Sequence, residues 1–304
     1  MHDSGVGGEE GVCVVSGSYS NGGSVAHKNL DARIDPILLE TVIMEDFGSV
    51  LEKRDRLGQF LFKLTHGKPV GYYAHHIKNL AILGAFSQTE MVNRILGICA
   101  AGVENLVLLV SPRDTWKFDL LDNALAGCHL RRLTIQLDKF FPSGFESEAT
   151  QPNFHHPCFK NITHLHLYDS AEKWPSYGGW DTLTHLTHLA FKFASPQHTV
   201  HLIQTTLQGV QYVAIGHYED TEVWRYAQAM VDNSGSDEGW SAVQGTSGPG
   251  MRFGNVVLMN GIPLDDWGRG VRGQGDFWDV VEWEVERRNE RLVAKRREEE
   301  EGGE

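Results

Sequence analysis

A short alternation of polar and aliphatic residues recurs seven times along the chain. Each segment has two variable residues, one polar or small residue, and an aliphatic pair two residues apart. Because successive side chains of a strand point to opposite faces, the aliphatic pair of each segment predicts one buried strand face. The segments are IKNLAIL from Ile77, VENLVLL from Val103, LRRLTIQ from Leu130, ITHLHLY from Ile162, LTHLAFK from Leu186, VQYVAIG from Val210 and FGNVVLM from Phe253.

The spacing of these segments is a second regularity. Successive segments begin 26, 27, 32, 24, 24 and 43 residues apart, and the first five intervals lie in or near the range of leucine-rich repeats. Stretches with helical spacing lie between them at 89–101, 116–127 and 196–209. Because strands and helices that alternate at this period stack their strands in parallel, the pattern predicts an α/β fold. The predicted fold is a leucine-rich-repeat-like solenoid, with parallel strands on one face and helices or loops on the other.

The aliphatic pairs form the predicted core of this solenoid. Both members of a pair face the interior, and pairs on neighbouring strands stack on one another. The fourteen predicted core residues are Leu80, Ile82, Leu106, Leu108, Leu133, Ile135, Leu165, Leu167, Leu189, Phe191, Val213, Ile215, Val256 and Leu258.

The chain divides into a repeat region and two ends of different composition. Residues 1–30 are rich in Gly and Ser, and residues 291–304 are mostly charged, so both ends are predicted to be disordered. The repeat region spans 31–290. An insertion at 217–252 interrupts it, and the Gly/Ser-rich part of that insertion is predicted to be a mobile loop.

Local signals predict two further helices at the ends of the repeat region. After a strand predicted at 38–44, apolar spacing predicts an amphipathic helix that ends at Gly67. Near the other end, Asp276 is predicted to be the N-cap of a helix. The apolar residues of this helix are predicted to cover the open end of the last repeat. They are Phe277, Trp278, Val280, Val281 and Val285.

Composition and charge narrow the classes of function. The formal net charge of −13 argues against a nucleic-acid-binding protein, which needs a basic face to replace phosphate counterions. The four cysteines lie far apart without a C-x-x-C pair, which is typical of a reducing compartment. The N-terminus lacks the basic start and apolar segment of a signal peptide, and the longest apolar run, 106–110, is too short to cross a bilayer. We therefore expect an intracellular protein, cytoplasmic or nuclear, that binds neither nucleic acid nor membrane.

A group of histidines is the main candidate for chemistry. His164 and His188 hold equivalent positions in adjacent repeats, and His166 lies two residues further along the same face. Three imidazoles on one face are a geometry that zinc could use, so the alternative function is a metal-dependent hydrolase. Hydrolase sites of this kind need further ligands, either a third histidine with a carboxylate or an H-x-H-x-D-H run, and here Asp169 comes one place late with no histidine after it. The repeat pattern favours polar residues on an exposed concave face, and we expect no metal.

The chain shows no other catalytic pattern. G-x-S-x-G, H-E-x-x-H and C-x-x-C are all absent, and GVRGQG at 270–275 lacks the strand and the ending of a phosphate-binding loop. We therefore expect a non-catalytic protein-interaction module without a cofactor, which binds its partner through side chains opposite the core. The candidate partner-binding residues are Asn79, Asn105, Arg132, Thr134, Gln136, His164, His166, Tyr168, His188, Lys192, Tyr212 and Asn255.

Three stretches carry a family resemblance. LRRLTIQLDKFF, the pair NITHLHLYD and LTHLTHLAF, and the ending DDWGRGVRGQGDFWDVVEWEVERR resemble F-box/leucine-rich-repeat-like proteins of mushroom-forming fungi. The resemblance covers roughly residues 31–290. It implies a repeat domain that recognises substrates of a cullin ubiquitin ligase, behind an F-box of about forty to fifty residues that docks onto a Skp-type adaptor.

The F-box itself has no counterpart in this chain. Residues 1–30 contain neither a Leu-Pro-x-Glu start nor a helical apolar pattern, so the docking residues cannot be carried over. We expect the partner to be an unidentified protein. A Skp-type adaptor is an expected partner only if a docking element is hidden in the chain or missing from it. A free-standing repeat protein, a paralogue that lost its box, a truncated chain and a paralogue without present function all remain open.

Overall fold

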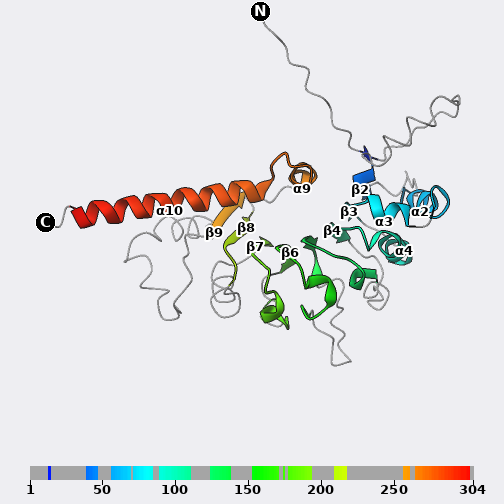
Figure 1. Cartoon of the computed structure of the whole chain (residues 1–304), viewed down its shortest axis with the longest axis horizontal. Helices are drawn as coiled ribbons and strands as arrows, with labels where there is room; N and C mark the ends of the chain where they lie inside the picture. Colours follow the sequence, from blue (N-terminus) through cyan, green and yellow to red (C-terminus); the bar gives the residue numbers. More distant parts are fainter. Residues whose placement is uncertain are drawn as a thin grey trace, which may run out of the picture.

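The computed structural model gives an α/β fold with one all-parallel sheet, whose strands form a curved row (Figure 1). The sheet has nine strands that pair strictly in chain order, from β1 to β9. The structure describes residues 13–14, 39–46, 56–69, 71–84, 89–110, 124–137, 153–170, 174, 177–193, 209–217, 256–260 and 264–301. The strands are β1 (Cys13–Val14), β2 (Thr41–Asp46), β3 (Asn79–Gly84), β4 (Asn105–Val110), β5 (Arg132–Ile135), β6 (His164–Ser170), β7 (His188–Phe193), β8 (Tyr212–His217) and β9 (Val256–Asn260).

The predicted pairing of aliphatic residues is confirmed strand by strand. Leu80 lies opposite Leu106, and the same register continues through the first member of each pair to Val256 on β9. The twelve predicted core residues on β3 to β8 are between 0% and 3% exposed. The side chains of Val256 and Leu258 lie outside the described residues. A face of stacked aliphatic pairs therefore forms one side of the main hydrophobic core.

Helices cover this aliphatic face near the start of the sheet. They are α2 (Arg56–His66), α3 (Tyr72–His76) and α4 (Thr89–Cys99), and apolar residues of all three belong to the main core. The helix predicted to end at Gly67 ends at His66, which confirms it. The helix predicted at 89–101 is confirmed as α4, whereas 116–123 and 196–208 lie outside the described residues. The strand predicted at 38–44 is β2, which begins later, at Thr41.

Further along the sheet, the described parts of two connections contain short 3-10 helices. The link from β5 to β6 contains the 3-10 helix η2 (Pro157–Phe159), and the link from β6 to β7 contains η4 (Trp180–Thr182). Aromatic side chains fill the space here: Trp174 is fully buried and stacks on Phe191 with ring centroids 3.8 Å apart. Large aromatic rings therefore cover the aliphatic face at the described parts of these connections.

The opposite face of the sheet is covered as well, which the sequence analysis did not predict. The helices α9 (Leu264–Gly270) and α10 (Phe277–Glu301) lie on the side of the strands away from α2–α4 (Figure 1). Phe277, Trp278, Val281 and Val285 are buried against Ala190 and Ala214. The prediction that these residues cap the last repeat is therefore wrong, because alanine on β7 and β8 leaves room for rings on the sheet face itself. We call this side the second face.

Both predicted disordered ends need correction where the structure describes them. Cys13 and Val14 pair with β2, although 1–30 was predicted to be disordered. The tail predicted from residue 291 continues as helix to Glu301, because good helix formers and i, i+4 pairs such as Lys295 with Glu299 support it. The remainder of both ends and nearly all of the insertion at 217–252 lie outside the described residues. No helix in the described part of the chain is both long and apolar enough to cross a membrane.

Candidate functional site

One row of polar side chains crosses the second face from β2 to β8. Each of its members occupies the first residue of its strand, and the strand register places them side by side. This polar ladder consists of Thr41, Asn79, Asn105, Arg132, His164, His188 and Tyr212. Six of its seven members were predicted as partner-binding residues, and the repeat brings them into one continuous line.

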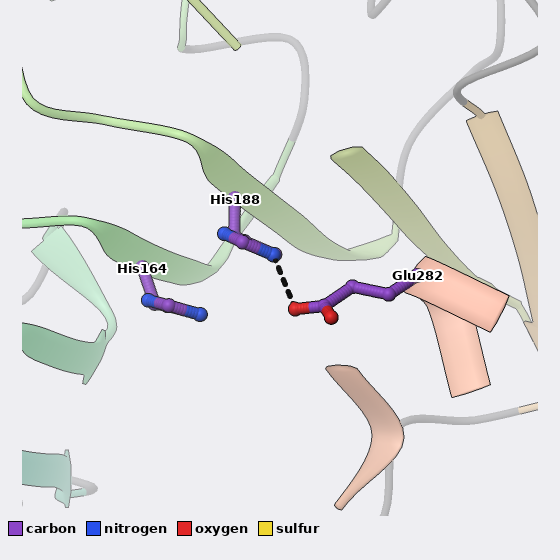
Figure 2. Close-up of side chains that lie close together, drawn as sticks. All are labelled: His164, His188 and Glu282. Carbon is purple, nitrogen blue, oxygen red and sulfur yellow. Dashed lines mark hydrogen bonds and ion pairs between the residues drawn. The ribbon is translucent and has the colours of Figure 1, made fainter. Parts of the chain in front are cut away.

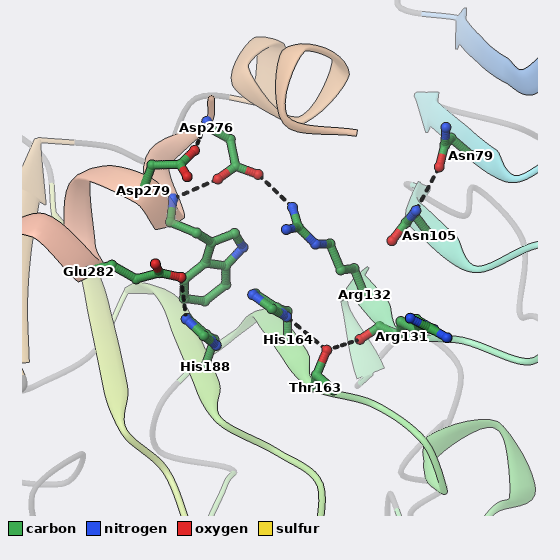
Figure 3. Close-up of polar contacts among 11 residues, drawn as sticks. Asn79, Asn105, Arg131, Arg132, Thr163, His164, His188, Asp276, Asp279 and Glu282 are labelled. Carbon is green, nitrogen blue, oxygen red and sulfur yellow. Dashed lines mark hydrogen bonds and ion pairs between the residues drawn. The ribbon is translucent and has the colours of Figure 1, made fainter. Parts of the chain in front are cut away.

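Side-chain amides form the first part of the polar ladder. Asn79 Nδ2 donates to Thr41 Oγ1 at 2.9 Å, and Asn105 Nδ2 donates to Asn79 Oδ1 at 2.6 Å (Figure 3). Asn79 is only 3% exposed. Since a buried amide is stable only when it is hydrogen-bonded, these contacts make Asn79 a structural residue of the sheet.

An ion pair joins the middle of the ladder to the last helix. Arg132 Nη1 lies 2.8 Å from Asp276 Oδ2. Asp276 also caps α10: its Oδ1 accepts from the backbone N–H of Trp278 at 2.9 Å, while Asp279 Oδ2 accepts from the N–H of Asp276 at 2.6 Å (Figure 3). This reciprocal arrangement is a capping box, so the N-cap predicted from the sequence is confirmed.

Aromatic stacking forms the end of the ladder. The rings of His164 and His188 are parallel within 8° with centroids 3.9 Å apart, and Tyr212 stacks on His188 at 4.6 Å. Trp278 of α10 meets both histidine rings edge-on at 5.4 and 5.3 Å. Glu282, one turn further along α10, places Oε1 2.8 Å from His188 Nε2 (Figure 2). The histidines therefore lie between the sheet and α10, on a face that is not open.

Burial changes the titration of these histidines. Desolvation, reinforced by the neighbouring charges of His188 and Arg132, lowers the pKa of His164 to about 2. Desolvation and Lys192 lower the pKa of His166 to about 3. The pKa values of both histidines therefore lie below the usual range because these rings are buried.

His166 belongs to a second row on the same face, two residues further along the strands. We call it the middle row. Its neighbours in register on β5, β7 and β8 are Thr134, Ala190 and Ala214. His166 is 3% exposed, lies against Phe277 and Tyr168, and borders a cavity of about 10 Å³. Of the three predicted histidines, only His164 and His188 have ring nitrogens that converge, and the third convergent group is Glu282.

Because helices cover the second face, several of the predicted partner-binding residues are buried. Asn79, Thr134, His166 and His188 were predicted on an exposed face and are buried, between 3% and 7% exposed. The partly exposed members are Asn105, Arg132, Gln136, His164, Tyr168, Lys192 and Tyr212, whereas Asn255 lies outside the described residues. Lys192 Nζ lies 4.4 Å from the ring centroid of Tyr168, a cation–π contact at the edge of the covered area.

A wider opening than the cavity beside His166 lies elsewhere, along the edge where the strands begin. This rim groove has a volume of about 500 Å³. Residues just before β3, β4, β5 and β6 line it, because the repeat brings each of these positions to the same edge. Its lining residues are Lys78, Ala101, Gly102, Glu104, His129, Arg131, Asn161, Thr163 and His185. This groove was not predicted from the sequence, although a polar residue two positions before each of the first four aliphatic pairs marks it.

Comparison with known proteins gives no relative for this chain. No family model, no curated protein and no solved structure matches it significantly.

Proposed function

We propose that this chain is a non-catalytic protein-interaction module, built as a leucine-rich-repeat-like solenoid and similar to the recognition half of F-box ubiquitin-ligase adaptors. The strict chain order of the strands and the alignment of their first residues from β2 to β8 support a repeat architecture. Repeat proteins of this kind use extended surfaces built from equivalent positions to bind other proteins. The family resemblance in the sequence agrees with this role.

The rim groove is the observation on which the proposal rests. It is open, polar and repeated in register, as expected of a surface that follows the edge of a solenoid. Lys78 and Arg131 flank Glu104, each with its nitrogen 3.9 Å from a Glu104 oxygen. Contacts of this length between exposed groups are weak, so the charged groups remain available for a partner.

The charge of the groove indicates the kind of partner. Lys78 and Arg131 outnumber the single carboxylate of Glu104, and the Arg131 side chain is 72% exposed. A segment of a partner protein that carries carboxylates fits this surface, because arginine binds carboxylates with two parallel hydrogen bonds. We assign this groove, together with the partly exposed Tyr168 and Lys192, as the partner-binding surface.

A two-stage experiment tests the function. Proteins captured by the tagged full-length chain are identified by mass spectrometry, and the strongest candidate is purified and titrated against the chain by calorimetry. Arg131→Glu is expected to weaken binding at least about tenfold, since it reverses a charge in the groove. Lys295→Glu makes the same charge change on the exposed end of α10 and is expected to leave binding unchanged. Equal affinity for wild type and Arg131→Glu would show that the groove is not the partner-binding surface.

The captured proteins also separate two versions of the function. Recovery of a Skp-type adaptor and a cullin with the full chain would support a substrate receptor of a ubiquitin ligase. Recovery of other proteins that bind through the groove, without these two, would support an independent binding module.

A further inference from the structure

Two threonine hydroxyls hold the Nδ1 atoms of the stacked histidines in place. Thr163 Oγ1 lies 3.1 Å from the backbone oxygen of Arg131, and Thr187 Oγ1 lies 3.2 Å from that of Thr163. The same oxygens lie 2.9 Å from His164 Nδ1 and 2.8 Å from His188 Nδ1. Where the hydroxyl donates to the carbonyl, its oxygen accepts from a proton on Nδ1, and Nε2 of that ring keeps a lone pair for a metal ion.

The Nε2 atoms of both rings point to the side of Glu282 (Figure 2). His188 Nε2 lies 2.8 Å from Glu282 Oε1, and a proton on Nε2 makes this contact a hydrogen bond. A metal ion in place of that proton would bind His164 Nε2 as well.

We propose that His164, His188 and Glu282 bind one divalent transition-metal ion, for which zinc is the best match. Their ligand atoms lie within 4.8 Å of one another. Two imidazole nitrogens and one carboxylate are a ligand set typical of zinc, whereas magnesium and calcium prefer oxygen ligands. The threonine hydroxyls hold Nδ1 of both rings, which is the outer-shell contact that orients metal-binding histidines. The site does not depend on the proposed partner-binding function.

The surrounding charges and access suit a cation. Arg132 is the nearest fixed positive charge on the ladder, and Asp276 pairs with it at 2.8 Å. The Glu282 side chain is 40% exposed, so an ion can enter from its side. Zinc bonds of about 2.0–2.2 Å require each ring plane to contain the metal, so the parallel rings must turn toward each other about the Cβ–Cγ bond. The bound ion would then tie α10 to β6 and β7.

Metal titration of the full-length chain tests this site. The protein is first dialysed against a chelator and then titrated with Zn²⁺ by calorimetry, and the bound metal is counted by elemental analysis. We expect one equivalent of zinc, and visible d–d absorption of a four-coordinate site with Co²⁺. Glu282→Gln and His188→Gln are each expected to lower the zinc affinity at least about tenfold, because each removes one of three protein ligands.

A matched histidine variant separates this site from adventitious binding. His66→Gln changes an exposed histidine of α2 whose Nδ1 also lies beside a threonine hydroxyl, and it is expected to bind zinc as the wild type does. Should His188→Gln fail to fold, Glu282→Gln still tests the site, together with hydrogen exchange on the wild type. Zinc is expected to slow exchange in the first turns of α10. Absence of stoichiometric zinc, unchanged affinity in Glu282→Gln, or unchanged exchange in α10 at saturating zinc would each overturn the proposal.

Discussion

Arg132 on β5 and Asp276 at the start of α10 lie 144 positions apart in the chain and form an ion pair of 2.8 Å. The Asp276 side chain is 5% exposed and that of Arg132 is 33% exposed. Burial raises the pKa of Asp276 even though Arg132 and two backbone N–H contacts at the cap oppose this shift. The cost of removing the carboxylate from water thus outweighs these attractions. The main role of the ion pair is therefore to fix where α10 begins, and its net contribution to stability is small.

Removal of Asp276 tests this arrangement. Asp276→Ala leaves Arg132 without its partner and α10 without its cap, and we expect the free energy of unfolding to fall by about 3 kcal/mol. Asp276→Asn is expected to cost less, because the amide oxygen can still accept from the backbone N–H of Trp278. Urea unfolding of both variants measures the difference.

An exposed pair provides the control for this prediction. Lys295→Ala removes the contact with Glu299, in which both side chains are at least 60% exposed, and should change the free energy of unfolding by less than about 0.5 kcal/mol. A similar small effect for Asp276→Ala would show that Asp276 does not anchor α10.

A second prediction concerns the small residues of the middle row, which lie beneath α10. Ala190 and Ala214 are fully buried beneath Phe277 and Trp278. Ala214→Leu adds volume to this contact, and we expect it to cost about 1–3 kcal/mol of folding free energy and to speed hydrogen exchange in the first turns of α10. Ala101→Leu, on an exposed turn, should do neither. Unchanged exchange in Ala214→Leu would mean that α10 is not held by this row.

The aliphatic face could be predicted from the sequence because its signal is local and repeated. A pair such as Leu165 and Leu167 fixes which side of its strand is buried, and the spacing to Leu189 fixes the register with the next strand. The N-cap at Asp276 could also be predicted, since capping depends on residues within a few positions. Both predictions needed no knowledge of distant contacts.

The cover of the second face could not be predicted in the same way, because it joins residues far apart in the chain. The pairing of His188 with Glu282 spans 94 positions, and no periodic pattern relates the two. A partial signal was present. The middle row carries Ala81, Val107, Ala190 and Ala214, which are too apolar for a face that stays open to water. That row indicated a covering element without identifying it.

The asparagine part of the ladder carries a third prediction. Asn79 donates to Thr41 and accepts from Asn105, so Asn79→Ala leaves two polar partners unsatisfied. We expect a loss of about 2 kcal/mol in the free energy of unfolding, and a smaller loss for Asn105→Ala, since Asn105 is less buried. Thermal and urea unfolding check both values. Equal losses in the two variants would show that the central position of Asn79 has no special role.

Two buried thiols carry the last prediction, a dependence of stability on pH. Desolvation raises the pKa of both Cys99 and Cys128 from 9.0 to about 12, and the charge of Cys128 contributes further to the raised pKa of Cys99. Below pH 9 both thiols are protonated in the folded and in the unfolded chain, so they add no pH dependence. Above pH 9 the unfolded chain loses these protons and the folded chain keeps them, so stability must fall as the pH rises.

The expected slope is at most about 1.4 kcal/mol per pH unit for each thiol once the pH is well above 9. The double variant Cys99→Ala/Cys128→Ala should show a flatter decline in the free energy of unfolding than the wild type. Its difference from wild type below pH 9 gives the packing cost of the two substitutions alone. Urea unfolding across this range measures the slopes, and parallel slopes would contradict the raised pKa values. Thiol-reactive reagents should likewise modify Cys99 and Cys128 only after the chain unfolds, because burial withholds the thiolate.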